Sequence, residues 1–556
     1  MSSPDSRPSL PHAALEELRA VVGGEHVLTS PADLERYSRC TIPWQRQCGA
    51  VVFPDNAEEV AGIVRIAGRY GIPLWPFSTG VNQGYGATLA TADGALVMLL
   101  TRMNRILEVN DKLAYAVIEP GVTYRQLNAY LKEHGHRLWL DCTDGPPQGS
   151  VLGNALDRGI GETPYGDHFG NLCGLEVVLP TGERIHTGGQ LSGLKTWHMH
   201  KWGVGPYLEG LFTQSNLGIV TQAGIWLMPQ PEAYNSFVYE VHDERHVPRV
   251  FDAFLELALH GVVNAKMHMI NDFVSITLLT QRGKEQVAQK GPLTEADLAH
   301  LRRKFRIAEW SCAGGLYGTR AQVRLQRTLL RKALGKYGKL TFIDDTRIRL
   351  LRLLLEVTAR VPLVRPVAEA ALGTTVHVME AAPHVHGILQ GIPSDHFIKH
   401  AYYRYRGLRP EQNADPARDH VGLVWFAPIL PFTKEDVLPF LSACRRRFAA
   451  RGFDFWVAQL LMNPRSVICL MSILYDREDA GEVERARRLY DELIDEMQAH
   501  GYQQYRCGLG GWPRLFEQAP EMRALNDRLK SALDPANTLA PGRYGMGAGL
   551  SVPMGE

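Results

Sequence analysis

Three stretches of the chain, far apart in sequence, carry residue types that bind anions and move protons. Pro76–Gly86 is a loop of small residues directly after an apolar run, Ile72–Trp75. Glycine permits positive φ values and close approach, so such a loop can turn backbone N–H groups towards phosphate oxygens. Asp141–Asp144 supplies carboxylates, and Tyr505–Arg506 with Ala540–Arg543 supply a phenol hydroxyl and guanidinium groups. These residues predict a phosphate-bearing cofactor with reactive polar side chains beside it.

The loop matches neither common nucleotide-binding pattern. It is not a Rossmann G-x-G-x-x-G sequence or a Walker A sequence, so nicotinamide and P-loop chemistry are not indicated. Eight cysteines are scattered without a C-x-x-C pair, which favours reduced, mostly buried thiols. His198 and His200 form an H-x-H, and five further histidines lie between His377 and His400, but no aligned carboxylates or cysteines accompany them. We therefore expect no metal site.

Composition and charge indicate an ordinary globular enzyme-sized chain. The 556 residues are 45% hydrophobic and 21% charged, with a net charge of +1, so no overall field attracts nucleic acid or a membrane surface. The N-terminus has no apolar signal core, and no stretch is long enough to span a bilayer, so we expect a cytoplasmic protein. The basic segment Leu301–Arg365 is interpreted as a solvated helical face, or else a contact for an acidic electron-acceptor protein or a second subunit.

The order of apolar patterns predicts the elements that position the loop. A strand at Val51–Phe53, a helix at Ala57–Arg69 capped by Asn56, and a strand at Ile72–Trp75 form a strand–helix–strand unit, which argues for an α/β region. Three more strands and an N-terminal helix are expected nearby; they are Leu96–Leu100, Tyr115–Ile118, Leu175–Leu179 and the helix Ala13–Val22.

Composition shifts near Pro229–Pro231, where a second region begins. It contains strands such as Ser236–Val241 and a last amphipathic helix, Val483–Met497. We expect an α+β fold with a cofactor domain built from both chain ends, residues 1–232 and 501–556. A central α/β cap domain, residues 233–500, would carry the substrate site.

Several separated blocks resemble the flavoproteins of the vanillyl-alcohol oxidase and p-cresol methylhydroxylase family, in shared order along nearly the whole chain. The blocks are Gly121–Tyr124, Gly149–Asn154, Thr163–His168, Gln214–Thr221, Ile225–Pro229, Trp425–Pro428, Leu474–Arg477 and Leu539–Gly542. The resemblance implies FAD in a PCMH-type FAD-binding domain, a flavin ring at the domain interface, and oxidation of para-substituted phenols through a quinone methide. It also implies a 4-cresol dehydrogenase-like enzyme that is a homo-oligomer, most simply a dimer.

The resemblance carries individual roles onto this chain. Tyr85, Tyr505 and Arg506 match the group that holds the phenolic oxygen, Arg543 matches a cation near the flavin's pyrimidine edge, and Asp144 matches an aspartate beside flavin N5. The residues expected to contact FAD are Pro76, Ser78, Thr79, Gly80, Asn82, Gln83, Gly149, Ser150, Gly153, Asn154, Ile219 and Arg543. Without the family name, two hydroxyls and a guanidinium would still lower the pKa of a bound phenol, ordinarily ~10, and so activate it.

Some positions depart from the family pattern. Leu423 stands at the position where oxidase members carry the histidine that links FAD covalently. Tyr402 is therefore the candidate for a covalent link, with His420 nearby. A non-covalent flavin is the alternative. In the substrate pocket, Gln459 and Ile468 replace ionisable residues, and Glu162 stands where oxidase members carry a tyrosine. These changes predict a para side chain longer or more apolar than methyl.

Alternatives remain open at this stage. Oxygen could reoxidise the flavin, as in a vanillyl-alcohol-oxidase-type enzyme that releases H2O2, or a cytochrome-type carrier could, as the insertion at Asp415–Asp419 favours. A carbohydrate or alkaloid oxidase with a doubly linked flavin needs a histidine that Ser78–Gly80 lacks. A non-catalytic flavin-binding subunit would not need Tyr85, Asp144 and Tyr505–Arg506 together.

Overall fold

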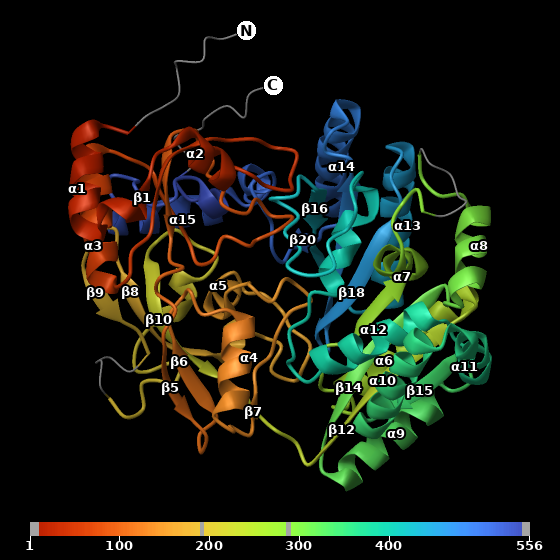
Figure 1. Ribbon diagram of the computed structural model, residues 1–556. Helices are drawn as coiled ribbons and strands as arrows, with labels where there is room; N and C mark the ends of the chain where they lie inside the picture. Colours follow the sequence, from red (N-terminus) through yellow and green to blue (C-terminus); the bar gives the residue numbers. More distant parts are fainter. Residues whose placement is uncertain (1–9, 189–193, 285–290, 548–556) are drawn as a thin grey trace.

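The computed structural model describes residues 10–188, 194–284 and 291–547. Figure 1 shows two halves side by side, with the N-terminal third of the chain on one side and its middle on the other. The C-terminal helix α15 (Pro520–Leu533) lies back among the N-terminal elements. Both ends of the chain therefore build one half, and the middle builds the other.

The first sheet contains the strand that leads into the glycine loop. Its order is β1-β2-β4-β3, with β4 parallel to both β2 and β3. The strands are β1 (Val27–Leu28), β2 (Cys48–Val52), β3 (Leu74–Phe77) and β4 (Ala95–Leu99), and helix α3 (Ala57–Tyr70) connects β2 to β3. The predicted strand–helix–strand unit is confirmed, although β3 begins two residues later than expected.

Helix α3 forms for reasons visible in its sequence. The Asn56 side chain accepts a hydrogen bond from the Glu59 N–H, as expected of a helix cap, and Gly71 ends the helix with a left-handed φ of 63°. Its buried face comes from Val60, Ile63 and Val64, which pack on the sheet. The helix thus makes the connection from β2 to β3, the strand that leads into the glycine loop.

The second sheet and its small neighbours complete this half. The five-stranded sheet has the order β5-β6-β10-β8-β9, and a two-stranded sheet pairs β11 with β7. The strands are β5 (Ile106–Asn110), β6 (Tyr115–Ile118), β7 (Leu138–Trp139), β8 (Leu172–Val178), β9 (Arg184–His186), β10 (Ile219–Trp226) and β11 (Met228–Pro229). Four helices pack around the two larger sheets; they are α1 (His12–Val22), α2 (Pro31–Tyr37), α4 (Tyr124–Glu133) and α5 (Val151–Leu156).

The second half is built on one large sheet. Its order is β15-β12-β14-β13-β18-β19-β17-β20, with β16 also paired to β19. The strands are β12 (Ala233–Val241), β13 (His268–Asn271), β14 (Trp310–Gly318), β15 (Lys339–Ile343), β16 (Gly422–Phe426), β17 (Pro428–Pro431), β18 (Trp456–Asn463), β19 (Ser466–Tyr475) and β20 (Gln503–Gln504). Its first strand begins at Ala233, next to the predicted boundary at residue 232.

Helices cover this sheet. They are α6 (Val247–Leu259), α7 (Asp272–Leu279), α8 (Glu295–Phe305), α9 (Arg320–Leu334), α10 (Asp345–Arg360), α11 (Arg365–Leu372), α12 (Val376–Ile388), α13 (Lys434–Ala450) and α14 (Ala480–Ala499). The predicted apolar stripe of α14 is confirmed, since Ala486, Leu489 and Leu493 are buried. One face of the sheet packs under α6, α13 and α14, and the other faces the first half.

The chain returns to the first sheet near its end. Leu539 forms a parallel bridge with Leu74, and the Ala540 N–H donates to the Leu74 carbonyl at 2.8 Å. The buried Lys530 ammonium secures this return through the Asp534 carboxylate and the carbonyls of Asn216 and Leu539. Residues 539–543 are thereby placed beside the strand that feeds the glycine loop.

Candidate active site

A large cavity lies where the two halves meet, with an empty volume of about 1740 Å³ including its open mouth. Its walls come from the glycine loop, from residues 143–160, from the β10 region and from the C-terminal return. Ile398, His400, Trp425, Leu460, Ile468 and Leu470 contribute from the second half. All five residues predicted to be catalytic, and every predicted FAD contact except Tyr402, line it.

The glycine loop is shaped by close approaches that larger residues would block. Gly80 has a φ of 73°, and a Cβ there would lie 2.7 Å from Thr88. Gly84 has a φ of 74° and lies against the Trp425 ring. The backbone N–H of Trp425 donates to the Gly84 carbonyl at 3.0 Å. The loop thus contacts both the cavity and strand β16 of the second half.

Helix α5 closes the other side of the loop. Ser150 caps the helix by accepting from the Gly153 N–H at 2.8 Å, while its own hydroxyl donates to the Pro120 carbonyl. A Cβ on Gly153 would lie 2.5 Å from the Ser78 oxygen, so the loop and the helix touch at this glycine. The predicted Gly149–Asn154 block and the glycine loop therefore form one continuous wall.

We expect Gly153→Ala to weaken FAD binding by about ten- to a hundredfold. Overpacking a tight contact costs ~1–3 kcal/mol, and here the added methyl must displace Ser78 from the cavity wall. Flavin fluorescence titration of the reconstituted apoprotein measures the change. Gly210→Ala is the matched control, because a Cβ there meets nothing within 4 Å. Equal affinities in the two variants would show that this contact does not shape the cofactor site.

Asp157 lies at the centre of the polar wall, and no motif in the sequence points to it. Its carboxylate is 7% exposed and accepts from Arg506 at 2.7 Å and from the Tyr544 hydroxyl at 2.6 Å. Arg543 approaches the oxygen that Tyr544 binds, Oδ1, at 3.5 Å. Burial alone would raise the pKa of Asp157, but Arg506, Arg543 and Tyr544 hold it below its usual value. The carboxylate is therefore ionised and anchors both guanidinium groups.

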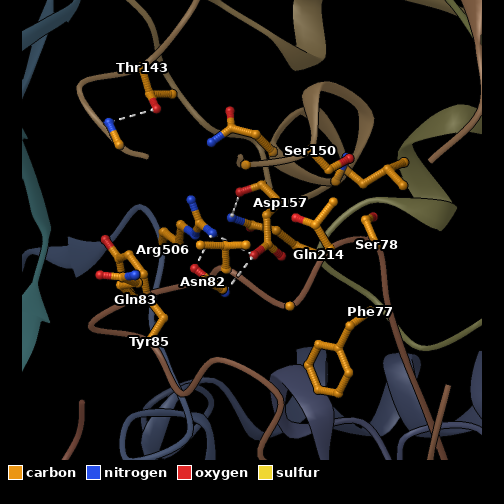
Figure 2. Close-up of a pocket in the computed structure, with 18 of the residues that line it drawn as sticks. Phe77, Ser78, Asn82, Gln83, Tyr85, Thr143, Ser150, Asp157, Gln214 and Arg506 are labelled. Carbon is orange, nitrogen blue, oxygen red and sulfur yellow. Dashed lines mark hydrogen bonds and ion pairs between the residues drawn. The ribbon is translucent and has the colours of Figure 1, made fainter. Parts of the chain in front are cut away.

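Arg506 and the two tyrosines converge on one part of the cavity. Arg506 also donates to Asn82 at 2.9 Å, and its guanidinium lies 4.5 Å from the centre of the Tyr85 ring. Figure 2 shows Arg506, Asn82 and Asp157 joined in the middle of the site, with Tyr85 on one side and Ser78 on the other. Tyr505 is fixed through its backbone, whose N–H donates to the Ala427 carbonyl at 3.0 Å.

Both tyrosines are poised as hydrogen-bond donors. Burial raises the pKa of Tyr85 well above its usual value and also raises the pKa of Tyr505, against the opposing charge of Arg506. The hydroxyls therefore stay protonated at neutral pH. Arg506 remains charged, because Asp157 outweighs the effect of burial on its pKa. Two O–H donors and a cation together form a site for an oxyanion.

Asp144 lies on the same cavity wall, supported from behind by buried polar groups. Its neighbour Thr143 accepts from the Gly145 N–H at 3.0 Å, which fixes the turn. Asp141 ties this turn to residues 162–168. Its carboxylate accepts from the N–H groups of Glu162 and Thr163, and it lies 2.7 Å from the His168 imidazole. The predicted carboxylate beside the substrate is thus brought to the cavity on a braced loop.

Two predicted pocket residues do not line the cavity. Gln459 lies on β18 between Ala458 and Leu460, which pack on the cavity side, so alternation along the strand turns Gln459 to the helix-covered face. Glu162 is buried behind the wall, where its carboxylate approaches the His268 imidazole at 2.8 Å. Ile468 does line the cavity. Sequence spacing could not show which face of a strand each side chain takes.

Tyr402 is likewise absent from the cavity wall. Its hydroxyl donates to Asp419 at 2.7 Å, and its ring is completely buried within the second half. The geometry gives no support to a covalent link at this tyrosine. His400, two residues earlier and named from the sequence only as one of a group of histidines unsuited to a metal, lines the cavity instead.

Several buried polar atoms of the cavity wall lack protein partners within the described residues. They are Nε of Arg506 and Arg543, both amide atoms of Gln83, Oδ1 of Asn216 and Nε2 of His400. Buried polar groups are normally satisfied, so this set fits a bound polar ligand. The glycine-lined loop, the two guanidinium groups and the cavity size fit FAD.

The fold and this cavity define an FAD-binding flavoprotein of the PCMH type. A family model described as "FAD binding domain" matches residues 49–188. The chain belongs to the vanillyl-alcohol oxidase and p-cresol methylhydroxylase family.

Three relatives support the assignment. The chain is 40% identical over 537 residues to 1'-carboxy-chondrochloren decarboxylase of Chondromyces crocatus, with 96% of each chain covered. Its fold matches 4-ethylphenol oxidase from Gulosibacter chungangensis, in complex with isoeugenol, with a TM-score of 0.85 and 30% identity, over 96% of this chain and 97% of that one. It also matches substrate-bound p-cresol methylhydroxylase with a TM-score of 0.85 and 27% identity, over 96% of each chain.

Two other structural features are absent from the described residues. None of the helices in the described part of the chain is long and apolar enough to cross a membrane. Within residues 10–188, 194–284 and 291–547, no group of three or more His, Cys, Asp or Glu side chains could hold a metal ion.

Proposed function

We propose that the protein oxidises the para side chain of a phenol by removing a hydride from the carbon attached to the ring. The observation that carries this proposal is the convergence of Tyr85, Tyr505 and Arg506 on one part of the FAD cavity, with Asp144 on the same wall. Oxyanion donors and a carboxylate in one buried site suit a substrate that becomes negative at one end and electron-poor at the other.

The protein groups act first on the phenolic oxygen. A phenol has a pKa of ~10 and donates electrons poorly while protonated. Tyr85 and Tyr505 donate hydrogen bonds to the oxygen, and Arg506 supplies the charge that lowers the phenol's pKa. The Nε of Arg506 has no partner among the described residues and is free to serve the substrate.

The resulting phenolate pushes its electrons through the ring and expels a hydride from the benzylic carbon. FAD, when bound, supplies the two-electron acceptor for that hydride. Asp144 stabilises positive charge developing at the benzylic carbon, and it can take the proton of a nucleophile that adds there. Apolar side chains from the second half, such as Ile468 and Leu470, exclude bulk water from this end of the cavity.

The quinone methide so formed has two chemical fates. Water can add to the benzylic carbon and give an alcohol, the outcome expected for a hydroxylating dehydrogenase. If the next carbon bears a carboxylate, loss of CO2 instead restores the aromatic ring and leaves a vinyl phenol. The decarboxylase name of the 40% identical relative favours the second fate as a candidate function.

We expect 4-ethylphenol to bleach the flavin absorbance of the anaerobic protein, and its O-methyl ether to bind without bleaching it. The ether fills the same volume but cannot become a phenolate, so the electron push is lost. Stopped-flow absorbance measures both reactions. Slow recovery of the absorbance after oxygen is admitted indicates a dehydrogenase that uses another acceptor, and rapid recovery indicates an oxidase. Rapid bleaching by the ether would contradict the proposed mechanism.

A further inference from the structure

His400 is a buried histidine of the cavity wall with no role in the chemistry described so far. It lies on the 3-10 segment Phe397–Arg404 of the second half and is 6% exposed. Its ring packs against two tryptophans that also contact each other, 5.1 Å from the Trp425 ring and 5.2 Å from the Trp456 ring. Such packing fixes the orientation of the imidazole within the cavity wall.

The hydrogen bonding of His400 leaves one nitrogen for a ligand. Nδ1 lies 2.8 Å from the Phe397 carbonyl, which can only accept, so Nδ1 carries a proton. Nε2 is buried and has no partner among the residues that the structure describes. Burial lowers the pKa of His400, while the negative charge of Asp144 opposes that change. The free protein therefore presents a neutral imidazole with a bare Nε2.

The other positively charged side chains of the cavity wall are paired with a carboxylate of the protein. Arg506 and Arg543 both face the carboxylate of Asp157. Asp144 is the acidic group that acts on His400, and the rings packed against the imidazole, Trp425 and Trp456, are uncharged. Of the described residues that line the cavity, His400 is the one side chain that can gain a positive charge not matched by Asp157.

We propose that His400 binds a carboxylate on the para side chain of the substrate, taking up a proton on Nε2 as the complex forms. The substrates are then phenols whose side chain bears the carboxylate on the carbon next to the benzylic one. Ile398, Leu460 and Leu470, which share this part of the wall, offer no hydrogen-bond donor of their own. The inference rests on the proposed function and specifies its substrate class.

The chemistry balances for such a substrate. The benzylic C–H bond breaks, and its hydride, with two electrons, passes to FAD. The bond to the carboxyl carbon then breaks, and its electron pair becomes the new side-chain double bond while the ring returns to a phenolate. CO2 leaves without charge. A histidine suits this step because its Nε2 can return its proton to solvent once the carboxylate charge has disappeared, whereas an arginine would keep its charge.

The test compares one neutral and one acidic phenol, 4-ethylphenol and 3-(4-hydroxyphenyl)propanoate. For the unmodified protein we expect the propanoate to bleach the flavin and yield 4-vinylphenol and CO2, measured by mass spectrometry. Binding of the propanoate should take up one proton more than binding of 4-ethylphenol, because the imidazole must be protonated in the complex and ionisation of the phenol is common to both substrates. Relative to that of 4-ethylphenol, propanoate binding should weaken as pH rises through neutrality. A pH indicator dye in weak buffer measures the uptake.

His400→Gln should weaken binding of the propanoate by ~10- to 100-fold, the loss expected for one charge-assisted hydrogen bond. The loss of propanoate affinity should exceed any loss of 4-ethylphenol affinity by at least tenfold. The extra proton uptake of the propanoate over 4-ethylphenol should vanish. His396→Gln is the matched control, since His396 is a buried histidine of the same region that does not line the cavity.

Equal losses for the two phenols, or equal proton uptake on binding of the two phenols, would overturn the role of His400 alone. Failure of both phenols to bleach the flavin of the unmodified protein would overturn the proposed function, and this inference with it. Bleaching by 4-ethylphenol while the propanoate neither binds nor reacts would again reject only the carboxylate site.

Discussion

Replacing Arg506 with methionine should slow flavin reduction by 4-ethylphenol by about a hundred- to a thousandfold at saturating substrate. Removal of one donor from a preorganised oxyanion site costs ~2.7–4 kcal/mol, and Arg506 supplies the charge as well as a donor. Tyr505→Phe should cost less, because it removes a neutral donor and leaves the guanidinium in place. Single-turnover stopped-flow measurements isolate this step from substrate binding.

A more acidic phenol is the internal control for this effect. A substrate already ionised at the assay pH needs less help from Arg506, so the deficit of Arg506→Met should shrink with it. Arg506→Lys keeps the charge but loses the guanidinium that contacts Asn82 and Asp157 together. Its rate of flavin reduction should lie between those of the unmodified protein and Arg506→Met. If the deficit is the same for weakly and strongly acidic phenols, Arg506 does not act by stabilising the phenolate.

Replacing Asp157 with alanine should destabilise the protein by ~3–5 kcal/mol and release FAD. The change leaves Arg506 and Arg543 with no counter-charge at a buried site, which is the costly way to break an ion pair. Urea unfolding of the apoprotein and of the FAD complex measures the two effects. Asp495→Ala is the matched control, because Asp495 is an exposed partner of Arg514 and should cost less than ~1 kcal/mol.

The sign of the pH dependence follows from the same contacts. The folded protein holds the pKa of Asp157 below its usual value, so its stabilising effect is complete at neutral pH. It is lost as the pH falls below about 4, through the folded pKa. The free energy of unfolding of Asp157→Asn should therefore be closest to that of the unmodified protein in strong acid. A variant as stable as the Asp495 control at pH 7 would show that Asp157 does not hold the two arginines in place.

Local patterns predicted much of the fold and the FAD side of the site. Helix α3 with its Asn56 cap, strand β6 and the glycine loop depend on neighbouring residues, which the sequence displays directly. The family and the FAD-binding fold are confirmed by the comparisons. The roles of Asp144, Tyr85, Tyr505 and Arg506 stay predictions, although all four reach one cavity.

The errors arose where three-dimensional packing decides. Gln459 faces away from the cavity because a one-residue step along a strand reverses the side chain. Tyr402 and His400 lie two residues apart, yet only the histidine reaches the cavity wall. Asp157 follows a short helix like many surface aspartates, and only the return of the chain brings Arg506 and Arg543 to it. The spacing of residues along the sequence does not predict this contact between Asp157 and the two arginines.

The pairing of Leu74 with Leu539 has a consequence for how the protein is made. The cavity wall needs residues near both ends of the chain, since Ala540 bonds to β3 and Arg543 reaches Asp157. During synthesis, strand β3 emerges from the ribosome more than four hundred residues before these partners do. The N-terminal part must wait, with its sheet edge and glycine loop incomplete, until residues 539–543 have been made. Cofactor loading therefore follows the synthesis of these residues.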